Sequence, residues 1–250
     1  MYLSLIASLG DEMINASTID ELREVLARAA HDLGFERFAL SLEIGRGSEF
    51  GTSVLIHDYP PSWADMYIGF NLGLSDPIRR AGENSLIGFK WQQVPGLIPI
   101  TDRERATYEA GIRHGIADGY TVPRHLPGET SGSCSFVIGP DGTLPESRLP
   151  EAEILGATAL ASARRVSGSE AWREAPQLTD RQRDCVLWAA RNKTDWEIGG
   201  ILGISRNTVV QHLRDARKRY NAIDRRALIL AVVYGGLISF ADIFRWRDDR

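Results

Sequence analysis

Cysteine is scarce in this sequence: its 250 residues include two, Cys134 and Cys185. Two cysteines this far apart provide neither a framework of several disulfides nor the closely spaced ligands of a structural zinc site. We therefore expect no metal site, no cofactor, and a reducing compartment, the cytoplasm.

Long apolar runs are also missing. The longest near the C-terminus, ALILAVVYGGLI at 227–238, is too short and too interrupted by glycine to span a bilayer. The first residues, MYLSLIASLGDEM, have no basic leader of the kind that begins a signal peptide. We expect no membrane partner.

Motifs of the common catalytic sites do not occur either. The sequence contains no G-x-S-x-G, no P-loop and no H-E-x-x-H, and its five histidines are scattered. We expect a protein that is not an enzyme.

The net charge of −4 is unevenly distributed along the chain. Residues 1–175 carry 15 basic and 24 acidic side chains, a net charge of −9, whereas residues 176–250 carry 14 and 9, a net charge of +5. The second part is therefore the one expected to meet a polyanion.

The first 166 residues alternate between helical and strand patterns. Segment 19–33 places its apolar residues on one helix face, and segment 35–44 alternates like a half-buried strand. By the same criteria we predict helices at 19–33, 61–70, 76–83, 102–114 and 150–166, and strands at 35–44, 51–57, 119–124 and 133–139. This order predicts an α+β domain with helices on an antiparallel sheet.

A polar stretch, SGSEAWREAPQ at 167–177, contains glycine and proline and lacks periodicity. We predict a linker at 169–177, between a first domain at 1–168 and a second at 178–250. No strand pattern follows the linker, so the second domain is predicted to be a small helical bundle.

Two capping boxes mark helix starts in the second domain. Thr179 is followed by Gln182, and Thr194 by Glu197. Gly203 then predicts a tight turn, and Ser205 the cap of a longer helix. A short helix, a short turn and a longer helix form the helix-turn-helix pattern.

The longer helix has two distinct faces. Val209, Leu213, Ala216 and Tyr220 form the inner one. The outer side offers amide, guanidinium and ammonium groups that can bond base edges and phosphates. Our candidate DNA-binding residues are Ser205, Arg206, Asn207, Gln211, Arg214, Arg217 and Lys218. The alternative is a solvated polar face, but the paired caps, the short turn and the positive charge favour DNA binding.

Aromatic residues gather in the segment YPPSWADMYIGFNLGLSDP at 59–77. Tyr59, Trp63 and Tyr67 have the spacing of one helix face, and Asp76 stands immediately before Pro77. Aromatics at this spacing are by default the rim of an apolar core, and an aspartate before proline is by default a turn former or cap. Together they can also surround a ligand, and the spacing alone leaves both interpretations open.

The helix-turn-helix stretch resembles that of the LuxR/FixJ family. The resemblance is carried by LTDRQRDCVLWAA, KTDWEIGGIL, ISRNTVVQHL and AVVYGGLI. Two departures are Gly199, where the family usually has alanine, and RKRYNAIDRR, where a lysine-leucine pair is more usual. Neither removes a cap or the outer face, although glycine lowers the helix propensity at position 199.

The first domain resembles the autoinducer-binding domain of LuxR-type quorum-sensing regulators. The motifs are YPPSW, Tyr67, the DP pair at 76–77, FKW ending at Trp91, and GIADGYTVP from Gly115. A response regulator of the same wider family would instead begin with a phosphoacceptor domain of alternating parallel strands. The resemblance implies an α-β-α sandwich with an antiparallel sheet, followed by an all-α, four-helix helix-turn-helix domain.

The resemblance also implies a ligand, an N-acyl or aryl homoserine lactone. By position, Trp63 would donate to the lactone carbonyl, Asp76 would accept from the amide N–H, and Tyr59, joined by Ser135, would donate to the acyl carbonyl. Tyr67 and Trp91 would form walls. The type of acyl tail and the sign of the response stay open.

The function we predict is that of a ligand-responsive transcriptional regulator in quorum sensing. It would bind a palindromic promoter site in double-stranded DNA as a homodimer, with RNA polymerase as a further candidate partner. Helix 150–166 and segment 227–238 are candidate dimer surfaces or intramolecular core. The alternative is a response-regulator-like or orphan LuxR-family regulator that senses a different small molecule.

Overall fold

The computed structural model describes residues 2–44, 52–70, 72–124, 132–167 and 176–244. These form two compact units, one of the described residues up to 167 and one from 176 onward. Apart from Pro176 and Gln177, the linker predicted at 169–177 lies outside the described residues.

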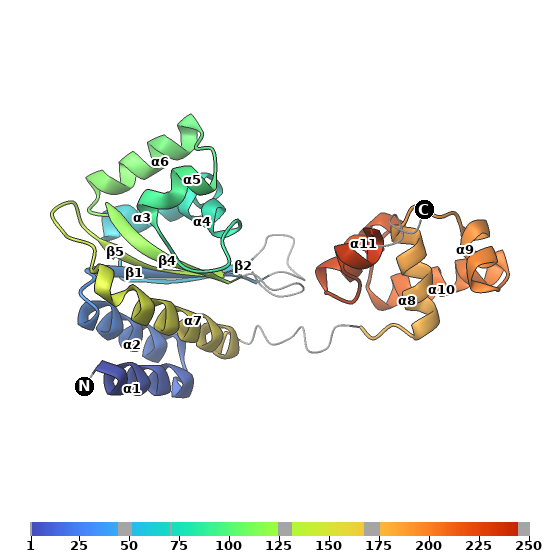
Figure 1. The fold of residues 1–250 in the computed structure, drawn as a ribbon, viewed down its shortest axis with the longest axis horizontal. Helices are drawn as coiled ribbons and strands as arrows, with labels where there is room; N and C mark the ends of the chain where they lie inside the picture. Colours follow the sequence, from blue (N-terminus) through green and yellow to red (C-terminus); the bar gives the residue numbers. More distant parts are fainter. Residues whose placement is uncertain (1, 45–51, 71, 125–131, 168–175, 245–250) are drawn as a thin grey trace. The chain divides into compact units, whose positions relative to one another are not determined.

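The first unit is built on an antiparallel sheet with strand order β2-β1-β5-β4-β3. The strands are β1 (Arg37–Ile44), β2 (Thr52–His57), β3 (Phe89–Lys90), β4 (Asp118–Arg124) and β5 (Gly132–Ile138). Figure 1 shows three helices on one face of this sheet, α1 (Tyr2–Asn15), α2 (Ile19–Asp32) and α7 (Leu149–Val166). The other face carries α3 (Pro61–Gly69), α4 (Pro77–Gly82), α5 (Val94–Leu97) and α6 (Asp102–Arg113).

The sheet separates two apolar clusters because successive side chains of a strand point to opposite faces. Leu40 of β1 and Phe136 of β5 are fully buried in the cluster that includes residues of α1, α2 and α7. On the opposite face, Val137 joins a smaller cluster with Trp63, Trp91 and residues of α4 and α5. The cluster on the first face is the larger core. The cluster on the second face contains Trp63 of the aromatic motif.

The predicted α+β class is confirmed, an α-β-α sandwich ahead of a helical domain. Each predicted helix and strand is present, with its ends within a few residues of the prediction. Helix α1, the two-residue strand β3 and the one-turn helix α5 were not predicted. The antiparallel sheet also excludes the parallel phosphoacceptor domain of the response-regulator alternative.

The second unit is a helical bundle whose first three helices begin at the predicted caps. Its helices are α8 (Asp180–Ala190), α9 (Asp195–Leu202), α10 (Arg206–Arg219), α11 (Arg225–Tyr234) and α12 (Phe240–Phe244), the last of which was not predicted. Both capping boxes are formed, at Thr179 and at Thr194. Gly203 has φ +66°, and Ser205 then caps α10 by accepting from the backbone N–H of Thr208.

Gly199 lies at the contact between α9 and the turn that follows it. A Cβ atom at this position would come within 2.7 Å of the Ile204 carbonyl oxygen. The alanine that is usual in the family would therefore require this turn to shift. The glycine has a packing reason here, beyond its low helix propensity.

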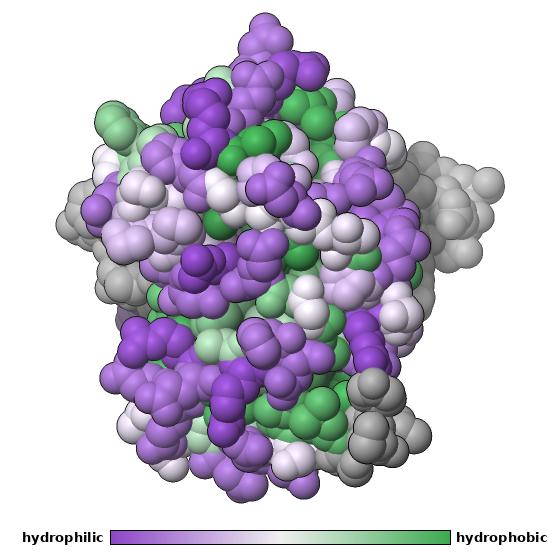
Figure 2. Space-filling model, turned by 90° about the vertical axis from the view of Figure 1, so that its left-hand side faces the viewer, coloured by the Kyte–Doolittle hydropathy of each residue, from purple (hydrophilic) through white to green (hydrophobic). Residues whose placement is uncertain are grey.

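The surface is predominantly hydrophilic on the face drawn in Figure 2, where apolar residues form separate groups set among polar ones. No helix in the described part of the chain is long and apolar enough to cross a membrane.

Candidate functional site

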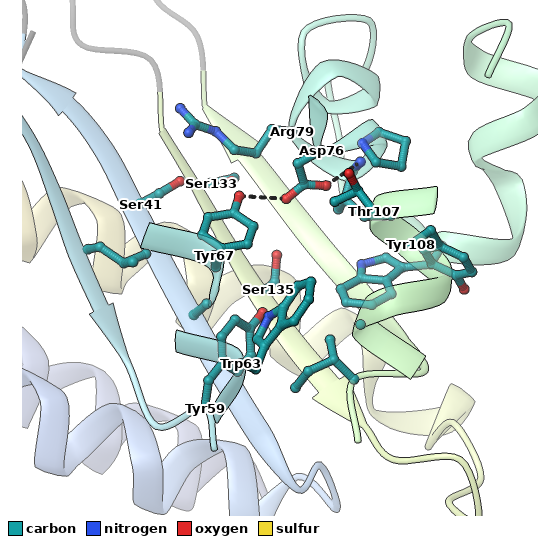
Figure 3. A pocket seen from close by; sticks show the side chains of 17 residues that line it. Ser41, Tyr59, Trp63, Tyr67, Asp76, Arg79, Thr107, Tyr108, Ser133 and Ser135 are labelled. Carbon is teal, nitrogen blue, oxygen red and sulfur yellow. Dashed lines mark hydrogen bonds between the residues drawn. The ribbon is translucent and has the colours of Figure 1, made fainter. Parts of the chain in front are cut away.

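A cavity of about 60 Å³ lies between the sheet of the first unit and helices α3, α4 and α6 (Figure 3). It brings together the six residues predicted to bind a ligand: Tyr59, Trp63, Tyr67, Asp76, Trp91 and Ser135. Pockets for drug-sized ligands usually have about 300–1,000 Å³. A bulky ligand therefore requires some of these side chains to move outward.

Helix α3 positions two of the three aromatics. The helix begins at Pro61, with Pro60 at its cap position, so Tyr59 lies before the helix and does not continue its face as the spacing suggested. Trp63 and Tyr67 lie one turn apart, with ring centroids 5.7 Å apart. All three still line the cavity.

Asp76 has two structural bonds as well as a place in the cavity wall. It caps helix α4, since its Oδ1 accepts from the backbone N–H of Ile78 at 2.8 Å. Its Oδ2 accepts from the hydroxyl of Tyr67 at 2.7 Å. Burial raises the pKa of Asp76, and the hydrogen bonds from Tyr67 and Ile78 and the charge of Arg79 oppose that rise.

Two donors in the cavity have no hydrogen-bond partner among the described residues: the hydroxyl of Tyr59 and the indole N–H of Trp63. Figure 3 shows both residues at one end of the cavity. Burial, and then the nearby charge of Asp76, raise the pKa of Tyr59, so its hydroxyl stays protonated and able to donate. Two donors and the Asp76 carboxylate thus line one small space.

Trp91 was predicted to be a wall of the cavity, and its indole N–H is also engaged. Its Nε1 donates to Thr121 Oγ1 at 2.9 Å, and this hydroxyl is 2.8 Å from Ser135 Oγ. The ring packs edge-on against Tyr108, with centroids 6.2 Å apart. Hydrogen bonds therefore connect Trp91 through Thr121 to Ser135, which lies on the cavity floor.

Gly119 allows this close approach of Trp91 to the sheet. A Cβ atom there would lie 2.5 Å from the Phe136 carbonyl oxygen and 3.0 Å from the Trp91 ring. We expect Gly119→Ala to destabilise the first unit by about 1–3 kcal/mol, because overpacking forces the neighbours to shift. Thermal unfolding followed by tryptophan fluorescence measures this. Gly96→Ala is the matched control, since nothing lies within 4 Å of its added Cβ; equal midpoints for the two variants would contradict the prediction.

Five polar residues of the cavity wall were not predicted: Ser41, Arg79, Thr107, Tyr108 and Ser133. Ser41 and Ser133 lie on adjacent strands, and their hydroxyls are 3.2 Å apart. Thr107 and Tyr108 come from α6, whose buried face is formed by Glu104, Thr107 and Gly111. The alternation of side chains along the strands could have placed Ser41 and Ser133 on the cavity face. The buried face of α6 is not apolar, so periodicity could not show which side of this helix faces the cavity.

Helix α10 presents the predicted outer face to solvent. Arg206, Asn207, Gln211, Arg214 and Lys218 are exposed, while Val209, Leu213 and Ala216 are buried as predicted. Gln211 donates from Nε2 to both carboxylate oxygens of Asp215 at 3.0 Å. The sequence interpretation did not consider Asp215, which engages the amide nitrogen of Gln211.

Two of the candidate DNA-binding residues also have structural bonds. Ser205 caps α10. Arg217 donates to the carbonyl oxygens of Ala222 at 3.5 Å and Ile223 at 2.5 Å, which holds the turn after α10. Arg206, Asn207 and Arg214 are exposed, whereas Arg217 is half-buried.

A domain whose cavity gathers a few convergent polar side chains among apolar ones, joined in one chain to a helix-turn-helix domain, defines the class of ligand-responsive DNA-binding regulators. Family models agree with both halves. The autoinducer-binding domain matches residues 18–166, and the bacterial regulatory proteins of the luxR family match residues 176–232. The chain belongs to the LuxR family of transcriptional regulators with an autoinducer-binding domain.

Similar proteins cover nearly the whole chain. The quorum sensing-dependent transcriptional regulator RpaR of Rhodopseudomonas palustris is 27% identical over 82% of this chain and 83% of its own length. The transcriptional activator AhyR of Aeromonas hydrophila is 25% identical over 88% and 86%. The crystal structure of Escherichia coli SdiA, 22% identical, superposes with a TM-score of 0.70 over 96% of this chain and 100% of that one, which shows the shared fold.

Proposed function

We propose that this protein is a quorum-sensing transcriptional regulator that binds an N-acyl or aryl homoserine lactone in a first domain at 1–168. A second domain at 178–250 binds a palindromic promoter site. The observation that carries the ligand assignment is the set of polar groups in one cavity: the Tyr59 hydroxyl and Trp63 N–H, which no described residue bonds, and the Asp76 carboxylate.

The polar atoms of the cavity match those of the lactone by hydrogen-bonding type. The Trp63 indole can only donate, which suits the lactone carbonyl. Ionised Asp76 can only accept, which suits the amide N–H. The hydroxyls of Tyr59 and Ser135 are available for the acyl carbonyl. Each buried polar group of the ligand thus gains a partner, and leaving one unpaired would cost about 1–3 kcal/mol.

Thermal unfolding with and without N-hexanoyl-homoserine lactone tests this function. Binding to the folded state alone, at a ligand concentration of about 100 Kd, adds about 2.7 kcal/mol, which corresponds to a rise of about 5–10 °C in Tm. N-hexanoyl-homoserine, the product of opening the lactone ring, is the control, since it keeps the acyl tail and loses the lactone. A structure of SdiA in complex with octanoyl-rac-glycerol is also known. Stabilisation of this chain by that glycerol ester but not by lactones would favour the alternative, a regulator that senses a different small molecule.

Lactone affinity is expected to fall as the pH is lowered. The ligand amide donates to ionised Asp76, whereas burial raises the pKa of this carboxyl in the free protein. Protonated Asp76 must release its proton to bind, so affinity declines below the raised pKa, which lies above the ordinary value of about 3.9. Calorimetric titrations over a descending pH series measure the decline. Asp76→Asn should give weak binding without this slope, and tighter binding on acidification would contradict the assignment.

DNA binding is proposed to occur in the cytoplasm, through a homodimer that recruits RNA polymerase. Leu230 and Tyr234 lie one turn apart on α11 and are 70% and 46% exposed, which supports the C-terminal segment as a dimer surface. Helix α7 instead buries most of its apolar residues within the first unit. A dimer would present two copies of α10 about 34 Å apart, which matches a palindromic site.

A further inference from the structure

The sheet face that forms the cavity floor carries four side-chain hydroxyl groups. It carries two cross-strand pairs of hydroxyls, Ser41 with Ser133 and Thr121 with Ser135. Thr121 and Ser135 are buried, whereas Ser41 and Ser133 are half-buried. Ser41, Ser133 and Ser135 line the cavity directly. Figure 3 shows the Ser41–Ser133 pair away from Tyr59 and Trp63, where the tail of a ligand held by those residues would lie.

Counting hydrogens shows what each pair can still do. Thr121 accepts from the Trp91 indole, and its hydroxyl shares a second hydrogen bond with Ser135. Since the Thr121 hydrogen is buried beside Ser135 Oγ, we take Thr121 as the donor of this bond. The hydrogen of Ser135 is then left for the cavity, in line with its role at the acyl carbonyl. In the Ser41–Ser133 pair one hydrogen makes the shared bond at 3.2 Å, so one O–H donor and several lone pairs remain for a second group.

The second pair lies at a definite distance from the first. Ser133 and Ser135 are two residues apart on β5 and point to the same face, which corresponds to about 6.6 Å. A tail that leaves the acyl carbonyl at Ser135 and follows the strand reaches Ser133 after a chain of roughly hexanoyl length. Its far end would then lie on the Ser41–Ser133 pair, where an alkyl chain would cover a donor and offer no acceptor.

We propose that the acyl tail of the ligand carries an oxygen at its far end, as a hydroxyl or a phenol, and that Ser41 and Ser133 recognise it. This inference rests on the proposed function, because it takes the lactone head to be held by Trp63 and Asp76. It sets the tail chemistry that the sequence left open: a terminally oxygenated acyl group of medium length is preferred over a plain alkyl chain.

The test compares N-hexanoyl-homoserine lactone with its ω-hydroxyhexanoyl counterpart, by calorimetric titration of the full chain. The two probes differ by one terminal oxygen. Wild-type protein is expected to bind the hydroxylated probe about threefold to tenfold more tightly. In the Ser41→Ala, Ser133→Ala double variant this preference should vanish, with the alkyl lactone bound at least as tightly as by wild type.

Ser135→Ala is the matched control, because it removes a hydroxyl of the same floor that faces the shared acyl carbonyl. It should weaken both probes by the same factor. Thermal unfolding of each variant verifies folding, and Ser133→Ala alone replaces the double variant if that one unfolds. Equal binding of the two probes by wild type, or a preference that survives in the variant, would overturn the tail assignment. Binding of neither probe would instead overturn the proposed function, and this inference with it.

Discussion

Asp76→Ala is expected to abolish the response to the lactone. The carboxylate would accept from the ligand amide, and it already accepts from the Tyr67 hydroxyl and from the backbone N–H of Ile78. Its removal deletes the ligand bond, leaves Tyr67 without its acceptor, and costs about 0.5–2 kcal/mol through the lost cap of α4. The measurement is the lactone-dependent rise in Tm, which should disappear.

Asp76→Asn separates recognition from folding. Asparagine is a good N-cap, so α4 keeps its bond from Ile78. Its amide nitrogen, however, presents donors where the ligand needs an acceptor. Hydrogen bonds to charged groups contribute about 1.5–3 kcal/mol, so the lactone Kd should rise by at least about tenfold while the unliganded Tm changes little.

Two controls accompany the asparagine variant. Asp65→Asn makes the same chemical change at an exposed position of α3 and should leave Kd unaltered. Tyr67→Phe removes the neighbouring hydroxyl and keeps the carboxylate, so lactone binding should persist. A normal response in both Asp76 variants would refute the assignment of the amide to this residue.

The second large effect is expected in the other unit. Arg214→Ala should lower affinity for the promoter site by about 1–3 kcal/mol, or roughly fivefold to 150-fold, and relax specificity at one base pair. Arg214 is exposed on α10, and its hydrogen bond to Gln211 is long, 3.5 Å from Nη1 to Oε1. The guanidinium is therefore available to a guanine edge. Fluorescence anisotropy on a site selected with wild-type protein measures the loss.

Matched variants distinguish base reading from charge. Lys218→Ala should weaken binding to all sequences about equally and lower the salt slope by about one. Arg103→Ala removes the same charge from an exposed position of α6 in the first unit and should leave DNA binding intact. Lactone binding by Arg214→Ala should equal that of wild type. Full operator affinity in this variant would show that the outer face of α10 is merely solvated.

Structure was predicted most reliably from the sequence where the interactions that determine it join residues close together in the chain. The helix-turn-helix follows from Thr179, Thr194, Gly203 and Ser205, each of which acts on backbone groups within a few residues. Asp76 was likewise predictable as a cap, because Pro77 fixes the start of α4.

Contacts between residues far apart in the sequence could not be predicted from local patterns. The Trp91–Thr121 bond joins residues 30 positions apart and depends on how β4 lies beside the η2 turn (Trp91–Gln93). The buried face of helix α6 could not be predicted, because Glu104 and Thr107 are polar and Gly111 is small. Periodicity reports apolar burial, and the inner side of a binding cavity need not be apolar.

The separation of the two sheet faces has an evolutionary consequence. On β5, Cys134 and Phe136 belong to the large core, while Ser133 and Ser135 face the cavity. Exchanging a floor residue is expected to alter what the cavity accepts and to leave the large core untouched, although the altered position is adjacent in sequence to a fully buried one. Descendants of such a protein can change the molecule they detect by single substitutions at every second position of a strand, without passing through an unfolded intermediate.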